Sequence, residues 1–218
     1  MRCLFWLKAL GLTVFMWAFF AAYFQVLRHP VNEVTLMPLT ALDHAIGFQP
    51  AALAVYISLW VYVGIAPMLL LQVRALLAYG LWIAAVCAVG LGLFYIWPTA
   101  VPAHTVDIAR YPAFAMLQGV DATGNACPSL HVATAMFTAV WVDRLLGTLR
   151  AGLAMRALNW IWLALIAYST MAIKQHVLLD VIAGALLGLA LALPSLSGRA
   201  GILRRGDVLC PRAVEASG

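Results

Sequence analysis

Charged side chains are scarce in this sequence. Only 10% of its 218 residues are charged, whereas 65% are hydrophobic, and the mean hydropathy is +0.98. A soluble globular domain has about 25% charged and about 45–50% apolar residues. The shortage of charge therefore excludes an ordinary soluble domain and indicates a protein that lies in a lipid bilayer.

Cysteine is also rare, with four residues in the whole chain and no Cys-x-x-Cys pattern. Cys3 and Cys210 lie near the two chain ends, which we expect to be cytoplasmic, and Cys87 falls inside a long apolar segment. This distribution excludes a disulfide framework and a cysteine-based metal site. We therefore interpret Cys127 as a small apolar packing residue.

The alternation of apolar and polar residues that marks membrane barrel strands is absent as well. The chain instead contains six apolar segments, and about 20 such residues cross a hydrocarbon core of about 30 Å. Backbone polar groups in lipid must be paired within each segment, so all six should be helices. The segments are roughly Leu4–Val26, Ala51–Val73, Ala75–Trp97, Leu130–Leu146, Leu158–Ile173 and Val177–Leu193.

We therefore predict an all-α, polytopic membrane protein. Residues 1–194 form a membrane-embedded six-transmembrane-helix bundle, and residues 195–218 form a cytoplasmic tail. The first segment has the basic start of a secretory signal, but its apolar run exceeds the about 7–15 residues of a signal core, so we expect a retained span.

The basic residues predict how the bundle is oriented. If both termini are cytoplasmic, only Arg28, Arg110 and Lys174 of the thirteen basic residues lie outside, which leaves ten inside. Cytoplasmic loops carry such an excess of Lys and Arg. We expect a multi-pass protein of the plasma or inner membrane with cytoplasmic termini. The net charge of +5 needs no nucleic-acid partner, because the basic residues orient the chain and contact membrane lipids.

Two outer connections, residues 27–50 and 98–128, are longer than simple turns. Each contains an amphipathic stretch, Val34–Ile46 in the first and Asp107–Val120 in the second. These stretches suit short helices at the headgroup level that border a slot for lipid access. Ordered loops that cover the bundle fit the same pattern.

His176 and Asp180 are four residues apart, which places both on one face of a helix. A carboxylate that accepts a hydrogen bond from one ring nitrogen fixes the tautomer and leaves the other nitrogen free to attack phosphorus. The pair alone also fits a structural contact between two helices. In the same segment, the Gly-x-x-x-Gly spacing of Gly184 and Gly188 predicts close helix packing.

The run from Asn125 to His131 has the features of a helix N-terminus. Pro128 suits the first turn, Asn125 and Ser129 are capping residue types, and the amides of such an N-terminus bind phosphate. His131 would lie beside that anion and could protonate a leaving-group oxygen. Together with His176 and Asp180, it predicts a phosphoryl-transfer site at the outer membrane face.

The two stretches NACPSLHVA at 125–133 and STMAIKQHVLLDVIAG at 169–184 resemble the type 2 phosphatidic-acid-phosphatase superfamily. Within it, they look most like the branch that includes inositol-phosphorylceramide synthases, in which Asp, Asn and Pro-Ser-Leu-His follow in the order of Asp121, Asn125 and Pro128–His131. The resemblance covers about 90 residues, from Pro98 to Gly184.

The resemblance implies a six-helix bundle with a metal-independent site and no cofactor. His176 would form the phosphohistidine, Asp180 would orient it, and His131 would protonate the leaving group. Ser129 would hold a phosphate oxygen, and Ser169 matches the family's serine upstream of the nucleophile. Asn125 is a further candidate for phosphate binding.

Two departures from the family pattern affect the cations that should hold the phosphate. Thr170 stands where the family has an arginine, and Trp97-Pro98-Thr99 stands in place of a motif with a lysine. A transferring phosphoryl group carries up to about two negative charges, so a cation should face it. Lys174 is the leading candidate for this clamp, followed by Arg110 and then His104.

The sequence thus predicts a lipid-phosphate phosphatase that acts on a lipid phosphate or an isoprenyl (di)phosphate. The alternative is a phosphotransferase that passes a phospho-headgroup to an alcohol acceptor. A transporter or structural membrane protein that binds headgroups without chemistry is the rival outside the enzymes. The two motifs argue against that rival, because mere binding needs no carboxylate-oriented histidine beside a second histidine and a helix N-terminus.

Overall fold

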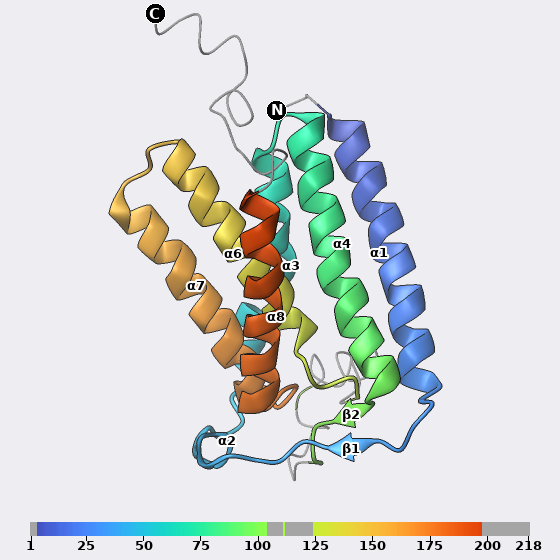
Figure 1. Cartoon of the computed structure of the whole chain (residues 1–218). Coiled ribbons are helices and arrows are strands. Elements are labelled where there is room, and N and C mark those ends of the chain that lie inside the picture. Colours follow the sequence, from blue (N-terminus) through green and yellow to red (C-terminus); the bar gives the residue numbers. More distant parts are fainter. Residues whose placement is uncertain (1–3, 104–110, 112–123, 198–218) are drawn as a thin grey trace, which may run out of the picture.

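Six long helices run up and down through the molecule in a computed structural model that describes residues 4–103, 111 and 124–197 (Figure 1). Each of them covers most or all of one segment that the hydropathy pattern predicts. Their bounds are α1 Phe5–Arg28, α3 Ala52–Leu69, α4 Val73–Ile96, α6 Leu130–Thr148, α7 Leu153–Ala172 and α8 Leu178–Ser197.

Four of these helices, α1, α3, α4 and α8, are long and apolar enough to cross a membrane. Helices α6 and α7 fall short because polar residues lower their hydropathy: Asp143 and Arg144 in α6, and Arg156 and Asn159 in α7. The prediction of a helical membrane protein is therefore confirmed, whereas the count of six membrane-spanning helices is not.

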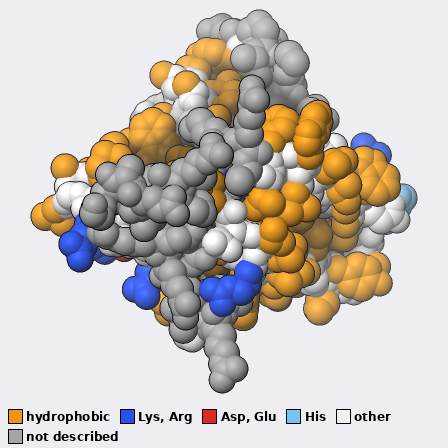
Figure 2. Space-filling view, turned by 90° about the horizontal axis from the view of Figure 1, so that it is seen from above, with side chains coloured by type: hydrophobic (Ala, Val, Ile, Leu, Met, Phe, Trp, Pro, Cys, Tyr) orange, Lys and Arg blue, Asp and Glu red, His pale blue; other side chains and the backbone are white. Residues whose placement is uncertain are grey.

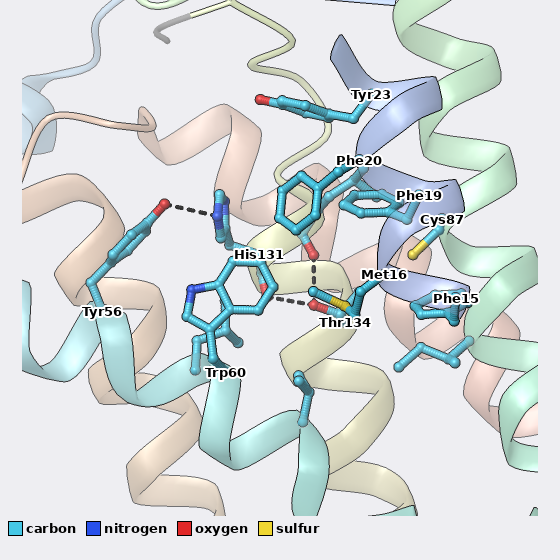
Figure 3. A pocket seen from close by; sticks show the side chains of 14 residues that line it. Phe15, Met16, Phe19, Phe20, Tyr23, Tyr56, Trp60, Cys87, His131 and Thr134 are labelled. Atoms are coloured by element: carbon cyan, nitrogen blue, oxygen red, sulfur yellow. Dashed lines mark hydrogen bonds between the residues drawn. The ribbon is translucent and has the colours of Figure 1, made fainter. Parts of the chain in front are cut away.

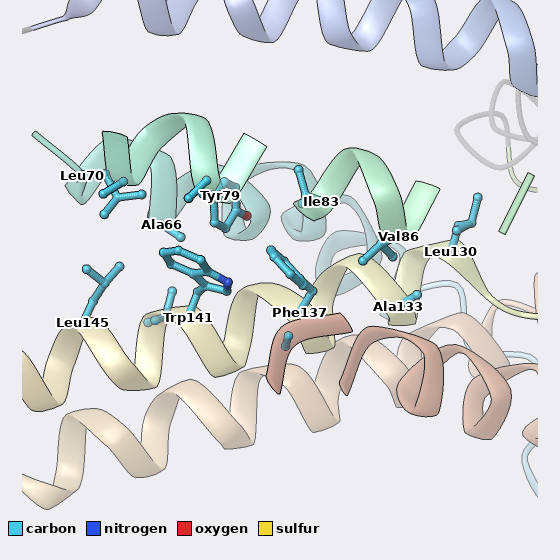
Figure 4. Close-up of a cluster of buried hydrophobic side chains, with 14 of the residues drawn as sticks. Ala66, Leu70, Tyr79, Ile83, Val86, Leu130, Ala133, Phe137, Trp141 and Leu145 are labelled. Carbon is cyan, nitrogen blue, oxygen red and sulfur yellow. The ribbon is translucent and has the colours of Figure 1, made fainter. Parts of the chain in front are cut away.

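Helix α6 lies at the centre of the bundle and supplies much of its core. Phe137 and Trp141 are fully buried between α6 and the facing side of α4, where Tyr79 and Ile83 pack against them (Figure 4). The Trp141 indole donates a 2.9 Å hydrogen bond to Ser195 Oγ on α8. Because Ser195 is buried in this contact and α8 continues to Ser197, the helical bundle extends three residues beyond the boundary predicted at residue 194.

Helices α6 and α8 approach each other very closely. A Cβ atom added at Gly184 would overlap the Ser129 carbonyl oxygen, and one at Gly188 would overlap that of Ala133. The interpretation of the Gly-x-x-x-Gly spacing as a packing feature is confirmed. This contact brings the first turns of α6 and α8 together, and these turns carry the predicted catalytic residues.

A small parallel pair of strands lies at the end of the bundle where α6 and α8 begin (Figure 1). Strand β1, Thr35–Leu36, pairs with β2, Thr99–Ala100, and the short helix α2, Ala41–Ala45, follows β1. Of the two alternatives for Val34–Ile46, the ordered loop holds for the first half, and the helix forms only over Ala41–Ala45. Pro38 explains this, because proline restricts the preceding residue to extended backbone and so keeps a helix from forming across it.

The helix α2 that does form begins with a capping box between Thr40 and Asp43. The second predicted amphipathic helix, residues 107–120, lies outside the described residues. The all-α class holds for this part of the chain except for the four residues of the two strands.

The first residue of α1 and the last residue of α8 lie at the same end of the bundle, opposite the strands (Figure 1). Viewed from that end, the bundle presents several Lys and Arg side chains and a largely apolar surround (Figure 2). Basic residues of the described helix ends and turns there include Arg74, Arg144, Arg150 and Arg156.

Candidate active site

The turn between α7 and α8 presents the candidate nucleophile to the bundle. Lys174 has a positive φ of 62°, its amide donates to the Met171 carbonyl, and the Gln175 amide donates to the Thr170 carbonyl. This is a Schellman motif, in which the residue after the helix is usually glycine. The His176 amide also donates to Thr170 O, at 3.2 Å, so the backbone of both Gln175 and His176 is anchored to the last turn of α7.

Asp180 lies behind His176. Its side chain is fully buried, and Oδ2 is 3.6 Å from His176 Nδ1 and 2.9 Å from the Val177 amide nitrogen, which donates to it. The carboxylate therefore caps α8 at the same time as it faces the histidine. His176 Nδ1 has no hydrogen-bond partner within the described part of the chain, so a small closure of the 3.6 Å gap would complete the predicted orienting bond.

The start of α6 is held against this pair. Ser129 is the N-cap residue, its Oγ accepts from the Val132 amide at 3.3 Å, and its own amide donates to the Asp180 carbonyl at 3.0 Å. The prediction of a helix start with Ser129 as a capping residue is confirmed, whereas Pro128 precedes the cap and lies outside the first turn. One backbone hydrogen bond thus joins the two sequence motifs directly.

The two histidines meet at the end of the bundle. His131 Nδ1 lies 3.2 Å from His176 Nε2, and the other ring nitrogen of His131, Nε2, lies 2.8 Å from the Tyr56 hydroxyl. Tyr56 comes from α3, and sequence reasoning missed it. Its only signal is that a tyrosine hydroxyl inside an apolar helix needs a polar partner, and this does not distinguish it from the other tyrosines of the chain.

These contacts agree on one arrangement of protons. If the Tyr56 hydroxyl donates to His131 Nε2, neutral His131 carries its proton on Nδ1 and donates to His176 Nε2. The His176 proton is then on Nδ1 and faces Asp180. We assign this arrangement from the hydrogen-bond pattern. It leaves the Nε2 lone pair of His176 directed toward His131, which is the lone pair that a nucleophile requires.

An apolar cavity of about 180 Å³ opens beside His131. Figure 3 shows Tyr56 and Trp60 of α3 on one side of His131 and Phe20 of α1 on the other. The Phe20 and Trp60 rings are 5.8 Å apart, and Trp60 is also exposed on the outer surface. The cavity therefore borders the lipid-facing side of the bundle between α1 and α3.

A second, much smaller cavity shares His131 with the first. His131 and His176 both line it, together with the polar side chains of Asn125 and Gln175. Asn125 has a positive φ of 52°, and its Nδ2 donates to the Tyr23 carbonyl at 3.5 Å. The structure thus brings Asn125 to the histidines, as the sequence predicts.

Lys174 makes contacts that the sequence does not predict. Its Nζ donates to the carbonyl oxygens of Asp43, at 3.1 Å, and of Ile46, at the end of α2. The Asp43 carboxylate accepts from the Leu178 amide at 2.8 Å. Burial raises the pKa of Asp43, but hydrogen bonds from Thr40 and Leu178 and the charge of Lys174 outweigh it, so the pKa lies below its usual value.

The remaining predicted residues line neither of the two cavities or lie outside the described chain. Ser169 Oγ is buried and donates to the Ile166 carbonyl within α7, at 2.7 Å. Arg110 and His104 lie outside the described residues. Cys127 is buried, and burial together with the nearby Asp180 raises its pKa to about 11, so it stays a neutral thiol, as a packing residue should.

Comparison with known protein families identifies the chain. A sequence profile of the PAP2 superfamily matches residues 36–193, a range that contains both histidines, Asp180 and Tyr56. Neither curated proteins nor solved structures give a significant match. The profile does not separate the branch of inositol-phosphorylceramide synthases from the others. Because the matched range covers well over half of the chain, the protein belongs to the PAP2 superfamily of membrane enzymes that act on lipid phosphates.

Proposed function

We propose that the protein is a lipid-phosphate phosphatase that works through a phosphohistidine on His176 at the outer membrane face. The observation that carries the proposal is the alignment of three groups: His131 Nδ1, His176 Nε2 at 3.2 Å and Asp180 on the far side of the His176 ring. His131 also lines the apolar cavity.

In the first step, the His176 Nε2 lone pair attacks phosphorus while the bond from phosphorus to the leaving oxygen breaks. Before this step the neutral His131 takes up a second proton on Nε2, and the imidazolium then gives its Nδ1 proton to that oxygen, so the lipid alcohol leaves neutral. Asp180 stabilises the positive charge that develops on the His176 ring, as the carboxylate of a catalytic triad does. The two rings are too close for phosphorus to fit between them, so the substrate must part them and replace their hydrogen bond.

In the second step, water attacks the phosphohistidine and the bond from phosphorus to Nε2 breaks. The neutral His131 accepts a proton from this water on Nδ1 and is again the imidazolium that acts in the first step. If an alcohol takes the place of water, the same intermediate gives a phosphotransferase.

The apolar cavity supports a substrate with a hydrocarbon chain. Its wall on α1 runs from Tyr23 to Phe15, eight residues or about 12 Å along the helix. A phosphate group beside His131 would then continue into a chain that lies between α1 and α3. Lipid phosphates and isoprenyl (di)phosphates have this form.

The proposal is tested with purified protein in proteoliposomes and phosphatidate or an isoprenyl diphosphate as substrate. We expect the wild type to release inorganic phosphate and His176→Asn to release none. Rapid acid-free quenching with labelled substrate should trap a phosphorylated protein that is stable in base and labile in acid. Full turnover by His176→Asn would refute the mechanism. Product analysis with added alcohols distinguishes hydrolysis from transfer.

The reaction should not require a metal ion. The carboxylates of Asp43 and Asp180 are already bonded to backbone amides at the start of α8, so they do not form the carboxylate cluster that a two-metal site needs. We expect turnover to survive EDTA. Loss that magnesium restores would contradict this.

A clamp role for Lys174 requires its amine to leave the carbonyls of Asp43 and Ile46. Lys174→Gly removes the amine without straining the positive φ at this position. A fall of about 10- to 150-fold in kcat/KM, with an unchanged melting temperature, would support the clamp. A lower melting temperature with normal kcat/KM would assign the amine to holding α2 against the turn.

A further inference from the structure

Gln175, the residue before the candidate nucleophile, has a buried amide donor that lacks a hydrogen-bond acceptor among the described residues. Its side chain is only 4% exposed, and Nε2 has no hydrogen-bond partner among the described residues. An unpaired buried amide is costly, and such groups are rare in folded proteins. An unpaired donor of this kind in an enzyme site indicates a ligand that supplies the acceptor.

The position of Gln175 indicates what that ligand is. Gln175 lines the small cavity with His131, His176 and Asn125. The volume of this cavity is about 10 Å³, close to what a single water-sized group needs. A sugar headgroup is far too large for it, whereas one oxygen of a phosphoryl group fits. Any oxygen placed there lies beside both histidines.

We propose that Gln175 is a substrate-binding residue whose Nε2 donates a hydrogen bond to a non-bridging oxygen of the phosphoryl group during its transfer to His176. The inference rests on the proposed function and adds a residue that no motif in the sequence identifies. Non-bridging oxygens are acceptors only, and they gain charge in the transition state, so a fixed donor aimed at one of them stabilises that state.

The local structure fits this role. The Schellman turn bonds the amides of Gln175 and His176 to the same carbonyl, Thr170 O, so donor and nucleophile share one rigid support. Among the described residues that line the two cavities, none is Lys or Arg. Thr170 itself is buried, and its hydroxyl donates to Ala167 O. Gln175 therefore supplies a neutral hydrogen-bond donor in a site whose described lining contains no lysine or arginine to bind the phosphoryl oxygens.

The test compares Gln175→Leu with wild type. The variant removes the donor and keeps the size of the side chain, so the melting temperature should stay the same or rise, because an unpaired buried donor is lost. Turnover of phosphatidate should fall by about 10- to 150-fold in kcat/KM, the range for a hydrogen bond to a charged group. Gln49→Leu is the matched control, because Gln49 is exposed at the same end of the bundle and lines neither cavity. It should keep normal kcat/KM.

Gln175→Glu separates binding from structure. An ionised carboxylate would repel the phosphoryl group, whereas a protonated one can donate a hydrogen bond. The ratio of variant to wild-type kcat/KM should therefore rise as pH falls from about 8 to about 5. A ratio that does not change with pH would contradict the proposal.

Binding of inorganic phosphate to the purified full chain, measured by calorimetry, separates this inference from the proposed function. If wild type turns over and Gln175→Leu keeps its kcat/KM within about twofold, the Gln175 inference is wrong and the function stands. If wild type is inactive but binds phosphate, and Gln175→Leu weakens that binding about tenfold or more, the phosphate-binding role of Gln175 stands, whereas the transfer to His176 and the proposed function are wrong. If wild type neither turns over nor binds phosphate, both are wrong.

Discussion

Tyr56→Phe removes one hydroxyl and tests whether the contact with His131 positions the proton donor. The hydroxyl lies 2.8 Å from His131 Nε2, and the ring is 1% exposed, so no solvent replaces it easily. The ring of phenylalanine fills the same space. The substitution therefore removes one hydrogen bond that orients the His131 ring and does not open a large cavity.

The magnitude follows from the loss of the hydrogen bond to His131. A neutral hydrogen bond contributes about 0.5–1.5 kcal/mol, which corresponds to about a 2- to 12-fold change in rate. A general acid as a whole accelerates a reaction by about 10²- to 10⁴-fold. The fall in rate for Tyr56→Phe should therefore be much smaller than the fall for His131→Ala, because Tyr56→Phe keeps the imidazole of His131.

The assay compares two leaving groups. An alkyl oxygen needs a proton as it leaves, whereas a nitrophenolate does not. Tyr56→Phe should slow the release of phosphate from phosphatidate several-fold and leave p-nitrophenyl phosphate turnover nearly unchanged. Tyr62→Phe is the matched control, because Tyr62 is buried on the same helix but donates to Asn159 Oδ1. It should affect stability and not the leaving-group dependence.

Two results would refute the reasoning. If Tyr56→Phe slows both substrates equally, the hydroxyl acts on the nucleophilic step or on folding and not on the proton donor. If it slows neither, the Tyr56 contact has no part in positioning His131.

Three further predictions concern the framework around the site. Gly184→Ala should lower the melting temperature and abolish most turnover, because its Cβ would push α6 away from α8, whereas Gly64→Ala, which meets no neighbour, should change little. Asp43→Ala should destabilise the protein by about 0.5–2 kcal/mol at neutral pH. Since the folded pKa of Asp43 is lowered, the difference in melting temperature should be present above about pH 4 and disappear as pH falls below it. In cells of a Cys3→Ser, Cys210→Ser background, Gly47→Cys should react with an impermeant maleimide and Gly152→Cys should not; the reverse labelling would overturn the outer-face assignment.

Spacing in the sequence identified those parts of the candidate site that are local. His176 and Asp180 are four residues apart, and Ser129 precedes His131 by two residues, so spacing links the members of each pair. Spacing does not show that the two pairs meet, because His131 and His176 are 45 residues apart. Close packing along one face of α8 was also predictable, because Gly184 and Gly188 mark it, but the sequence did not identify α6 as the partner helix.

The contacts that were missed join distant segments or involve backbone atoms. Tyr56 and His131 are 75 residues apart, and nothing in an apolar helix identifies which tyrosine faces a histidine. The Lys174 amine binds two main-chain carbonyls, and carbonyl acceptors leave no trace in a sequence. The amide of Gln175 became visible only as a donor without a partner, which is a property of the folded state.

The charge of the site provides a means of choosing between a monoester and a diester substrate. Among the described residues that line the cavities, only His131 and His176 can carry a positive charge. A phosphate monoester is a dianion above its second pKa of about 6, whereas a diester is a monoanion throughout. A site with few cations should favour the monoanion, because burying a second uncompensated charge is costly.

This preference can be measured as the ratio of kcat/KM for a phosphodiester lipid to that for phosphatidate. Both substrates meet the same enzyme, so the enzyme's own protonation cancels from the ratio. The ratio should fall as pH drops through about 6, because phosphatidate then becomes a monoanion and loses its disadvantage. A high ratio at neutral pH would favour transfer of a phospho-headgroup over hydrolysis of a monoester. A ratio that is independent of pH would show that substrate charge does not limit binding, and that a cation outside the described residues, such as Arg110, balances the second charge.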